Sequence, residues 1–395
     1  MGRLWDKGDP LDQRVLKYTA DEDHRLDERL VAYDVRGSIA HATMLQEQGL
    51  LAQQDCEAIV RGLTELGDEH ARGEWTIRLE DEDCHTALEA RLTERIGEAG
   101  GRVHLARSRN DQVLTALRLY LKDEVASLVT ETGEAIHGLE ALAKAQGNIE
   151  LPGYTHMQRA MPSSVALWAH GFATELQDDL EGLQGTLRRI DKNPLGSAAG
   201  YGVPVLPIDR ERTAELLGFG AVHEPVTAVQ LSRGKAEAHV LFEVAMLMQD
   251  LGRLAADLVL FATQEFAFVQ LPEALTTGSS IMPQKRNPDL FELVRGRSGQ
   301  AQAWLLEVMA VTSKLTSGYH RDLQLLKAPL FRGLDAAHDT LLLMTHALEG
   351  ITFRRENIRL DESLFAAEQA YRLVVEEGIP FREAYRRVAE ELKGG

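Results

Sequence analysis

The sequence predicts an all-α protein in which a central bundle of very long helices is flanked by two smaller helical domains. Only 12 of its 395 residues are proline, and none occurs between residues 11 and 151, between 226 and 271, or between 289 and 328. Within these windows the apolar residues recur at helical spacing, whereas no run of alternating β-branched residues marks a sheet. The expected regions are an N-terminal domain (1–107), the bundle (108–350) and a short C-terminal domain (351–395).

Two apolar stripes define the long helices. One begins at Val113 and continues to Leu142, so we expect a helix over about residues 113–146, which would span about 50 Å at a rise of 1.5 Å per residue. The other covers residues 241–261 and is broad enough to be covered on most sides. A connector rich in proline and glycine, residues 193–207, joins two long helices. We interpret both stripes as core packing, and long helices with wide apolar faces also predict a homo-oligomer.

The composition excludes several classes of protein. Acidic residues outnumber basic ones by 61 to 43, and the net charge of −18 argues against nucleic acid or an anionic membrane as a partner. Two cysteines, Cys56 and Cys84, are too few for a disulfide framework. The N-terminus lacks the apolar core of a signal peptide, and charged residues interrupt the apolar region 240–271. We therefore expect a soluble cytoplasmic protein.

Three polar segments interrupt the helical pattern, and the first directly precedes the first long helix. Ser108, Asn110 and Asp111 are all residues that cap helix N-termini, although one cap is sufficient. Arg107 and Arg109 stand where the helix dipole disfavours cations. Two guanidinium groups beside exposed N-terminal amides indicate a receptor for a carboxylate.

The second polar segment places His156 between two prolines, next to Thr155, Gln158 and Arg159. A lone histidine is often a structural residue. Its polar neighbours equally allow a role in general acid–base catalysis. Both interpretations stay open from these residues alone.

The third polar segment, residues 276–289, combines Gly278, Ser279, Lys285 and Asn287 in one short loop. Glycine and small hydroxyl residues let backbone N–H groups approach a ligand, and the lysine and asparagine add a cation and a neutral donor. The Gly-Lys-Ser/Thr sequence of a Walker loop is missing, and no hydrolase nucleophile elbow surrounds the serines. A tight turn between helices needs glycine and proline, but it does not need these polar residues together.

Together the three segments resemble a known family. The loop Gly278–Pro288 is similar to the signature of the fumarase/aspartase superfamily, whose members eliminate fumarate from substituted succinates, and this similarity implies an all-α fumarase/aspartase-like fold. The resemblance extends from Leu4 to about residue 390. Four other segments are similar to argininosuccinate lyases, a family that includes the delta-crystallins, and these are Glu82–Glu89, Ala106–Gln112, Gly153–Ala160 and Tyr319–Lys327.

The resemblance implies roles for individual residues. Ser279 is implied to take the Cβ proton of the substrate, and His156 to be the other acid–base group, oriented by Glu292. Lys285 and Asn287 would hold the carboxylate on which negative charge develops. Besides Arg107 of the guanidinium pair, the implied substrate-binding residues are His85, Ser108, Arg109, Asn110, Thr155, Tyr319, Gln324 and Lys327.

The activity that the resemblance implies is the reversible elimination of argininosuccinate to L-arginine and fumarate, a step of arginine biosynthesis. No metal or organic cofactor is expected, because the substrate carboxylate is its own electron sink. Asp83, His85 and Glu89 could form a metal set, but their spacing is common on helices. The family forms homotetramers with sites built from three subunits. Asn110 precedes the first long helix and His156 follows it, so a straight helix would hold them about 50 Å apart within one subunit.

Alternatives come from three classes. Another lyase of the superfamily, such as adenylosuccinate lyase or fumarase, would share the serine loop. A non-catalytic crystallin-like protein and a helical scaffold are the others. The chain also departs from the family pattern: Asp23 replaces a substrate-binding serine, Asp6-Lys7-Gly8 follows Leu-Trp, and the C-terminus is short. The added carboxylate of Asp23 suits the cationic end of the substrate.

Overall fold

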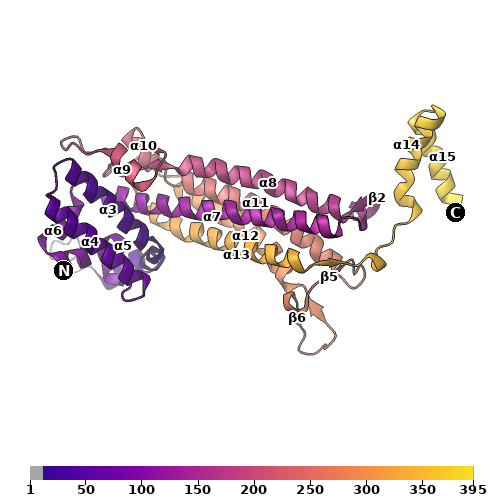
Figure 1. Cartoon of the computed structure of the whole chain (residues 1–395), viewed down its shortest axis with the longest axis horizontal. Helices are drawn as coiled ribbons and strands as arrows, with labels where there is room; N and C mark the ends of the chain where they lie inside the picture. The colour runs from indigo at the N-terminus through magenta and orange to yellow at the C-terminus, as the bar shows by residue number, and fades with distance from the viewer. Residues whose placement is uncertain (1–11, 395) are drawn as a thin grey trace. The chain divides into compact units, whose positions relative to one another are not determined.

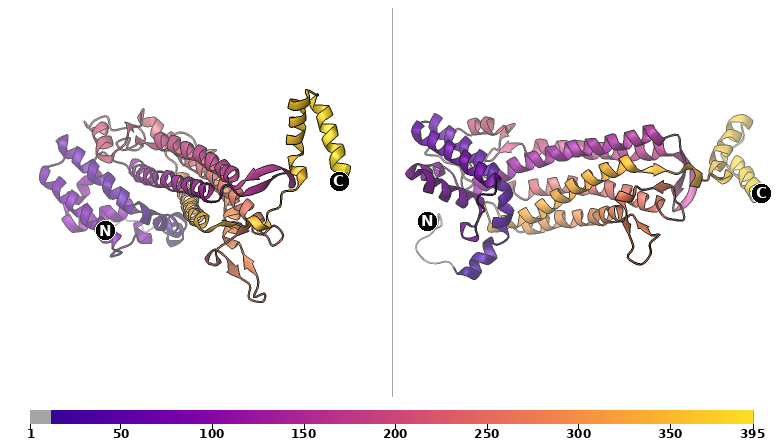
Figure 2. Two further views of the ribbon diagram at one scale, coloured as in Figure 1. Left: turned by 45° about the vertical axis from the view of Figure 1, so that its right-hand side comes forward. Right: turned by 60° about the horizontal axis from the view of Figure 1, so that its bottom comes forward.

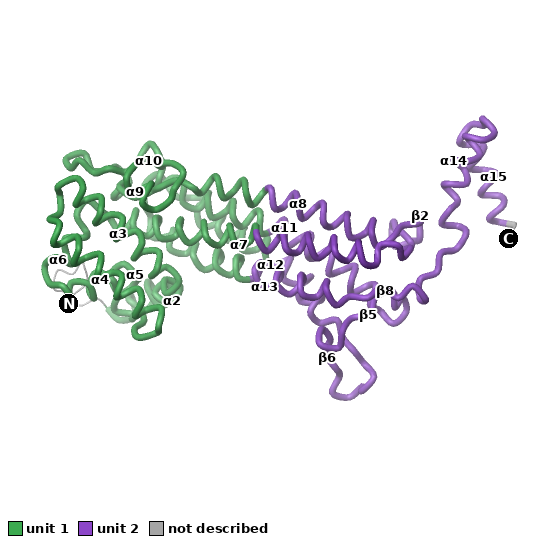
Figure 3. Tube along the Cα trace, viewed as in Figure 1, with its two compact units in different colours: residues 1–129, 182–244, 301–335 green, residues 130–181, 245–300, 336–395 purple. Residues whose placement is uncertain are grey.

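The computed structural model describes residues 12–394, so Asp6, Lys7 and Gly8 lie outside the described residues. The described chain is all-α, as predicted, and divides into two compact units (Figure 3). The three predicted regions differ from these units, which cut across the long helices, and that division stays a prediction. Unit 1 comprises residues 1–129, 182–244 and 301–335, and unit 2 comprises residues 130–181, 245–300 and 336–395.

Five long helices form the framework of both units. Each contributes one segment to each unit, and within a unit these segments lie side by side (Figure 1). The apolar stripes of the first and third helices are largely buried, which confirms their interpretation as core. The five helices are α7 (Arg109–Gln146), α8 (Val165–Ile190), α11 (Lys235–Phe261), α12 (Asp289–Thr312) and α13 (Lys327–Gly350).

Helix α7 begins at Arg109 because Ser108 caps it. The Ser108 hydroxyl oxygen accepts the backbone N–H of Asn110 at 3.3 Å, and the Ser108 N–H donates to the carboxylate of Asp111 at 3.0 Å. The other carboxylate oxygen of Asp111 accepts two backbone N–H groups of the connector 193–207, at 2.8 and 2.9 Å. Asp111 therefore fastens the connector to the start of α7.

Helix α7 continues without a break through Gly133 and Gly138, so the prediction of one long helix is confirmed. A Cβ built at Gly138 would lie 3.4 Å from the side chain of Leu348 on α13, which is tighter than an ordinary contact. The glycine therefore permits a close approach of α7 and α13 within unit 2.

The remainder of unit 1 consists mainly of shorter helices. Tyr120 of α7 packs edge-on against Tyr33 of one short helix at 5.6 Å and against Phe331 of the long helix α13 at 5.0 Å, and so links the short helices to the long ones within unit 1. The connector 193–207 lies between the long helices α8 and α11, as predicted, and two of these short helices stand between its end and α11. The short helices are α1 (Gln13–Ala20), α2 (Asp23–Leu26), α3 (Val31–Glu47), α4 (Gln53–Ala71), α5 (Cys84–Ile96), α6 (Glu98–Gly101), α9 (Arg210–Leu217) and α10 (Val226–Leu231).

Short strand pairs occur between the helices. Residues 152–162, expected as a loop, belong to an antiparallel hairpin of β1 (Glu150–Thr155) and β2 (Gln158–Ser164), in which Pro152 faces Pro162 (Figure 2). A two-stranded ribbon consists only of edge strands, which tolerate proline. The other pairs are β5 (Val269–Gln270) with β8 (Thr352–Phe353), β6 (Thr277–Gly278) with β7 (Arg286–Asn287), and in unit 1 the parallel pair β3 (Lys192–Asn193) with β4 (Ala221–Val222).

Aromatic packing organises the core of unit 2. Trp168 contacts Phe172, Phe261 and Phe353 with ring centroids 5.5 to 5.9 Å apart, and its indole N–H donates to Asp257 at 2.9 Å. Near the C-terminus, α14 (Ala366–Glu377) and α15 (Phe381–Gly394) form a helical hairpin with a small core of its own. Among residues 12–394, no helix combines the length and the apolar character needed to cross a bilayer.

Candidate active site

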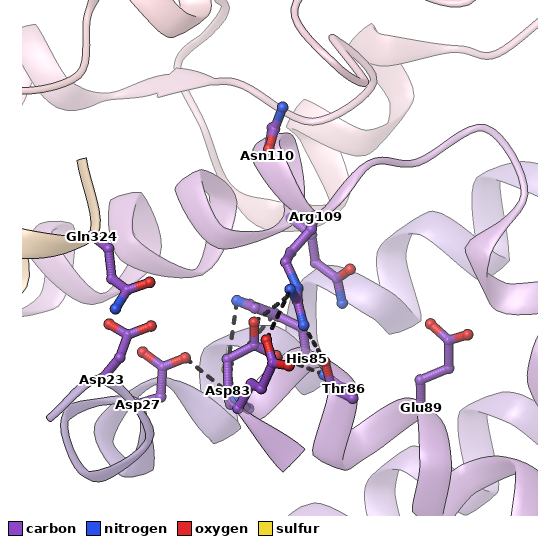
Figure 4. Close-up of polar contacts among 12 residues, drawn as sticks. Asp23, Asp27, Asp83, His85, Thr86, Glu89, Arg109, Asn110 and Gln324 are labelled. Atoms are coloured by element: carbon purple, nitrogen blue, oxygen red, sulfur yellow. Dashed lines mark hydrogen bonds and ion pairs between the residues drawn. The ribbon is translucent and has the colours of Figure 1, made fainter. Parts of the chain in front are cut away.

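The predicted carboxylate receptor lies at the first turn of α7, where Arg109 is held by the start of α5 (Figure 4). Its Nε donates to the Asp83 carboxylate at 2.8 Å, and a second guanidinium nitrogen donates to the Thr86 hydroxyl. Asp83 also caps α5, because its other oxygen accepts the Thr86 backbone N–H at 2.9 Å. A weaker contact joins Arg109 to Glu82 at 3.8 Å. The guanidinium is thus oriented by carboxylates of the chain itself.

Arg107, the other predicted guanidinium, is buried in unit 1 and donates to a serine hydroxyl at 2.8 Å. Burial lowers its pKa, and the charge of Asp34 opposes this effect. The neighbouring His41 is also fully buried, and one ring nitrogen donates to a backbone carbonyl at 2.7 Å. Burial and the charge of Arg107 lower the pKa of His41 to about 3. Of the predicted pair, only Arg109 lines the pocket described below.

His85 is buried and forms an ion pair with Asp34. Its Nδ1 lies 3.0 Å from the Asp34 carboxylate, which also accepts the side-chain amide of Gln112 at 2.9 Å. Burial is the largest single influence and acts to lower the pKa of His85, but the charge and hydrogen bond of Asp34, together with the charges of Asp83 and Asp27, outweigh it and raise the pKa. Burial acts to raise the pKa of Asp34, but the charge and hydrogen bond of His85, the charge of Arg107 and the hydrogen bond of Gln112 together bring it below its usual value. His85 is therefore a buried, ion-paired residue that supports the site from inside the protein.

The metal set considered from the sequence is divided among separate partners. Asp83 pairs with an arginine, and Glu89 lies 3.2 Å from a histidine ring nitrogen. A different group, formed by Asp27, Cys84 and His85, places three ligand atoms within 4.8 Å of one another. Burial raises the pKa of the Cys84 thiol well above its ordinary value, and a lysine already pairs with Asp27. These residues suit ion pairing better than metal binding.

Lys327 is the centre of a buried charge cluster in unit 1. Its side chain is 2% exposed, and its ammonium pairs with Asp23 at 2.5 Å and with Asp27. Burial acts to lower the pKa of Lys327, but the two carboxylates outweigh it and raise the pKa, so the lysine stays charged. Burial raises the pKa of Asp23 to about 7, although Lys327 acts to lower it. Two carboxylates therefore share one ammonium group.

One pocket of unit 1 brings together four predicted substrate-binding residues, Arg109, Tyr319, Gln324 and Lys327. The side-chain amide of Gln324 donates to the backbone carbonyl of Thr19 at 2.7 Å. Figure 4 shows Gln324 beside the two aspartates that pair with Lys327. The remaining lining residues are Asp23, Asp27, Glu82, Asp83, Val113, Arg233 and Arg321.

The sequence analysis missed Arg233 and Asp27 as pocket residues. Arg233 stands in the turn between α10 and α11, is 5% exposed, and lies over the Tyr319 ring at 5.6 Å. An arginine directly before an apolar helix was a weak signal for it. Asp27 follows Asp23 by four residues, a spacing that places two carboxylates on one side of a helical segment.

In unit 2, His156 and Met157 form the tip of the β1–β2 hairpin. Both have positive φ angles, 52° and 58°, as in a two-residue type I′ turn. Asparagine and glycine are the usual residues of such a turn, so a histidine and a methionine there strain the backbone. The turn exposes His156 and the preceding Thr155. A strained, exposed histidine favours the catalytic interpretation over the structural one.

The serine loop projects from the β6–β7 pair in unit 2. The Ser279 hydroxyl oxygen accepts the backbone N–H of Met282 at 3.1 Å. The Asn287 side-chain amide donates to the Thr277 hydroxyl at 3.4 Å. Lys285 is exposed, and no ion pair to it occurs among residues 12–394. The polar groups of this loop are therefore largely available to a ligand.

Glu292 lies in the first turn of α12 and is exposed. The nearest cationic partner of its carboxylate is Arg295, at 3.9 Å. Within the described residues of one chain, no hydrogen bond or ion pair joins Glu292 to His156, or either of them to Ser279. The predicted catalytic residues are carried by three separate elements of unit 2, and their assembly into one site stays a prediction.

Comparison with known proteins places the chain in a family. Residues 7–303 match the model of a lyase family. An argininosuccinate lyase of Sorangium cellulosum is 47% identical over 392 residues, which cover 99% of this chain and 90% of that protein. The structure of EDDS lyase in complex with formate has a TM-score of 0.81 at 25% identity and covers 96% of this chain and 76% of its own. The class II fumarase of Schistosoma mansoni has a TM-score of 0.81 at 20% identity, with coverage of 93% and 85%.

The chain belongs to this lyase family, and its fold is that of the fumarase/aspartase superfamily. The resemblance inferred from its sequence segments is confirmed by the match over nearly the whole chain. Members of the family act on small molecules, which agrees with a polar pocket in unit 1 and rules out the interpretation as a plain helical scaffold.

Proposed function

We propose that the chain catalyses the reversible elimination of argininosuccinate to L-arginine and fumarate in the cytoplasm. The strongest single support is the pocket of unit 1, where four residues expected to bind this substrate lie together (Arg109, Tyr319, Gln324 and Lys327). The 47% identity to an argininosuccinate lyase supports the same substrate.

The proposed reaction begins when a base removes a proton from the carbon next to a substrate carboxylate. The electron pair of that C–H bond moves into the carboxylate and then forms the C=C bond of fumarate, while the C–N bond breaks and the leaving guanidine nitrogen takes up a proton. Ser279 and His156 supply these two proton transfers, and Glu292 orients the histidine. Which of the two groups acts as the base is for the kinetics of single variants to decide.

The carbanion is the costly species, so donors must be aimed at the carboxylate that receives its charge. One lysine at about 4 Å contributes about 4 kcal/mol at an effective dielectric constant of 20. This is equivalent to about three pKa units. Lys285 and Asn287 take this role, and closure of the loop 276–289 over the substrate would add backbone donors and exclude water.

The proposed active enzyme is a homotetramer in which different chains contribute to one site. Asn110 lies in the first turn of α7, and His156 follows the end of this uninterrupted helix by ten residues of chain. The exposed catalytic side chains of unit 2, with no mutual contacts in one described chain, support a site that another chain completes.

The experiment is to incubate the purified chain with argininosuccinate and follow fumarate by its ultraviolet absorbance. We expect turnover without added metal and without inhibition by a chelator. Equal or faster turnover of adenylosuccinate or malate would overturn the substrate assignment. Absence of any turnover would favour the non-catalytic, crystallin-like role.

A further inference from the structure

The β1–β2 hairpin of unit 2 carries His156 on a strained tip. His156 and Met157 both have positive φ angles and both are exposed. Such a conformation costs free energy in residues that have a Cβ, and it persists only where the surrounding structure enforces it. A hydrogen bond at the tip, from the side-chain amide of Gln158 to the carbonyl of Met157 at 3.1 Å, is itself exposed to water. The contacts that hold the tip therefore lie further along the hairpin.

One of these contacts is on β1, at Tyr154. The Tyr154 ring packs edge-on against Phe266, with ring centroids 6.2 Å apart. Phe266 in turn packs against the buried Phe268 at 5.3 Å, and Phe268 packs against Phe261 at 5.8 Å. The first strand of the hairpin is thereby joined to the aromatic core of unit 2.

The second contact is on β2, directly opposite the first. Arg159 is the cross-strand partner of Tyr154, and its Nη1 donates to the carboxylate of Asp361 at 2.9 Å. Among residues 12–394, Asp361 is the only acidic residue that forms an ion pair with Arg159. Both ends of this cross-strand pair are therefore attached to the rest of unit 2.

Asp361 is held in place by its own neighbours. It caps the short helix η7 (Glu362–Phe365), because one carboxylate oxygen accepts the backbone N–H of Ser363 at 3.1 Å and also the Ser363 hydroxyl. The hydrogen bond of Ser363 and that of Arg159 lower the pKa of Asp361, so the carboxylate is charged at neutral pH. Strand β2 lies beside η7, which continues directly into α14.

We propose that Arg159 and Asp361 are positioning residues for His156. Only the Thr155–Gln158 pair separates the anchored Tyr154–Arg159 pair from the turn, so the ion pair sets how the turn is oriented and fastens it to the start of the C-terminal helical hairpin. Displacement of a reacting group by about 1 Å costs about a hundredfold in rate. This inference rests on the proposed function, in which His156 is an acid–base group, and adds what places its side chain.

The kinetic test compares Arg159→Gln, Asp361→Asn and the double variant. We expect kcat for argininosuccinate to fall about tenfold in each single variant with little change in KM, because the substrate-binding residues are untouched. Asparagine at position 361 still caps η7, so only the charge is removed. The double variant should be no slower than either single variant, since the second charge has no partner once the first is gone.

Three further variants serve as controls. Arg159→Lys keeps a cation at the site of a single Nη1 contact and should keep most of kcat. Arg372→Gln breaks an exposed ion pair of α14, with Glu368 at 2.5 Å, and should leave kcat unchanged. Ser363→Ala removes a hydroxyl that Asp361 accepts without touching the ion pair, and it should also leave kcat unchanged.

Several results would overturn the proposal. One is an Asp361→Asn enzyme with the kcat of the wild type. Another is an Arg159→Gln enzyme in which only KM rises, since this would assign Arg159 to substrate binding. A third is a double variant whose loss equals the product of the two single losses, because independent effects exclude a pair. If Arg159→Gln does not fold, Asp361→Asn carries the same test.

Hydrogen exchange of the backbone amides separates failure of this inference from failure of the proposed function. The amides of residues 154–159 should lose protection in Arg159→Gln and in Asp361→Asn and keep it in Arg372→Gln. If the wild type does not turn over argininosuccinate, the proposed reaction is wrong, and the exchange data still show whether the ion pair fixes the turn. Equal protection in the wild type and in both single variants overturns the inference.

Discussion

The two groups of predicted site residues differ in how the chain supports them. In unit 1, Lys327 and His85 are almost completely buried and ion-paired, and Arg109 is fixed by a carboxylate at 2.8 Å. In unit 2, His156 and Lys285 are exposed on short turns. The difference indicates that the two groups of residues have separate roles. Under the proposed function, the first group is an organised binding surface with its charges in place, and the second is a set of reactive groups that the substrate and, in the proposed oligomer, neighbouring chains would organise.

This comparison predicts that a change in the buried group affects stability most. Lys327→Met would leave Asp23 and Asp27 buried without their counter-ion, and removal of one partner of a buried pair costs about 3–5 kcal/mol. Urea denaturation measures this loss in the free energy of unfolding. The control Lys314→Met, at an exposed position, should change it by less than about 0.5 kcal/mol. Equal stability of both variants would contradict a structural role for the cluster.

A change in the exposed group is predicted to affect catalysis and leave stability nearly unchanged. Ser279→Ala should lower kcat about a hundredfold with little change in KM, because the hydroxyl acts mainly in the transition state. The adjacent Ser280→Ala is the matched control and should retain its rate. Retention of more than about a tenth of kcat by Ser279→Ala would mean that proton transfer depends on another group.

The pH dependence of stability sharpens the comparison further. The pKa of His41 is lowered to about 3 in the folded chain by burial, first, and by the charge of Arg107. Between about pH 6.5 and pH 3 the unfolded chain binds a proton that the folded chain does not, so stability falls as the pH falls. The expected slope is about 1.4 kcal/mol per pH unit. Asp23 and His85, whose pKa values are raised in the folded chain, contribute with the opposite sign in part of this range, so the test is the difference between two proteins: the slope of the wild type, from denaturation at several pH values, should exceed that of His41→Phe by about 1.4 kcal/mol per pH unit. An identical slope in the wild type and in His41→Phe would refute the assignment of this pH dependence to His41.

The sequence predicted the long helices because their apolar residues repeat over many turns, and a local period of this kind needs no tertiary information. It failed for the hairpin around His156, where strands of six and seven residues contain prolines and give no alternating pattern. Arg109 and Lys327 were identified as substrate-binding residues because the segments that contain them resemble those of argininosuccinate lyases. The carboxylates that position these two residues were not predictable, because Asp83 and Asp27 are 26 and 300 positions away in the sequence.

Arg233 shows the same limit from another direction. Only the packing of the surrounding helices reveals that it lines the pocket, and that two of its buried guanidinium nitrogens have no hydrogen-bond partner among residues 12–394.

The central claim is that the binding group of one chain and the reactive group of another form each site. Two inactive variants, Asn110→Ala and His156→Asn, are dissociated, mixed at equal ratio and reassembled, with mixed oligomers confirmed by mass. Each site draws Asn110 from one chain and His156 from another, and each of the two is intact with a probability of one half, so about one quarter of the wild-type activity should return. No recovery in confirmed mixed oligomers would show that one chain supplies both residues and would contradict the account.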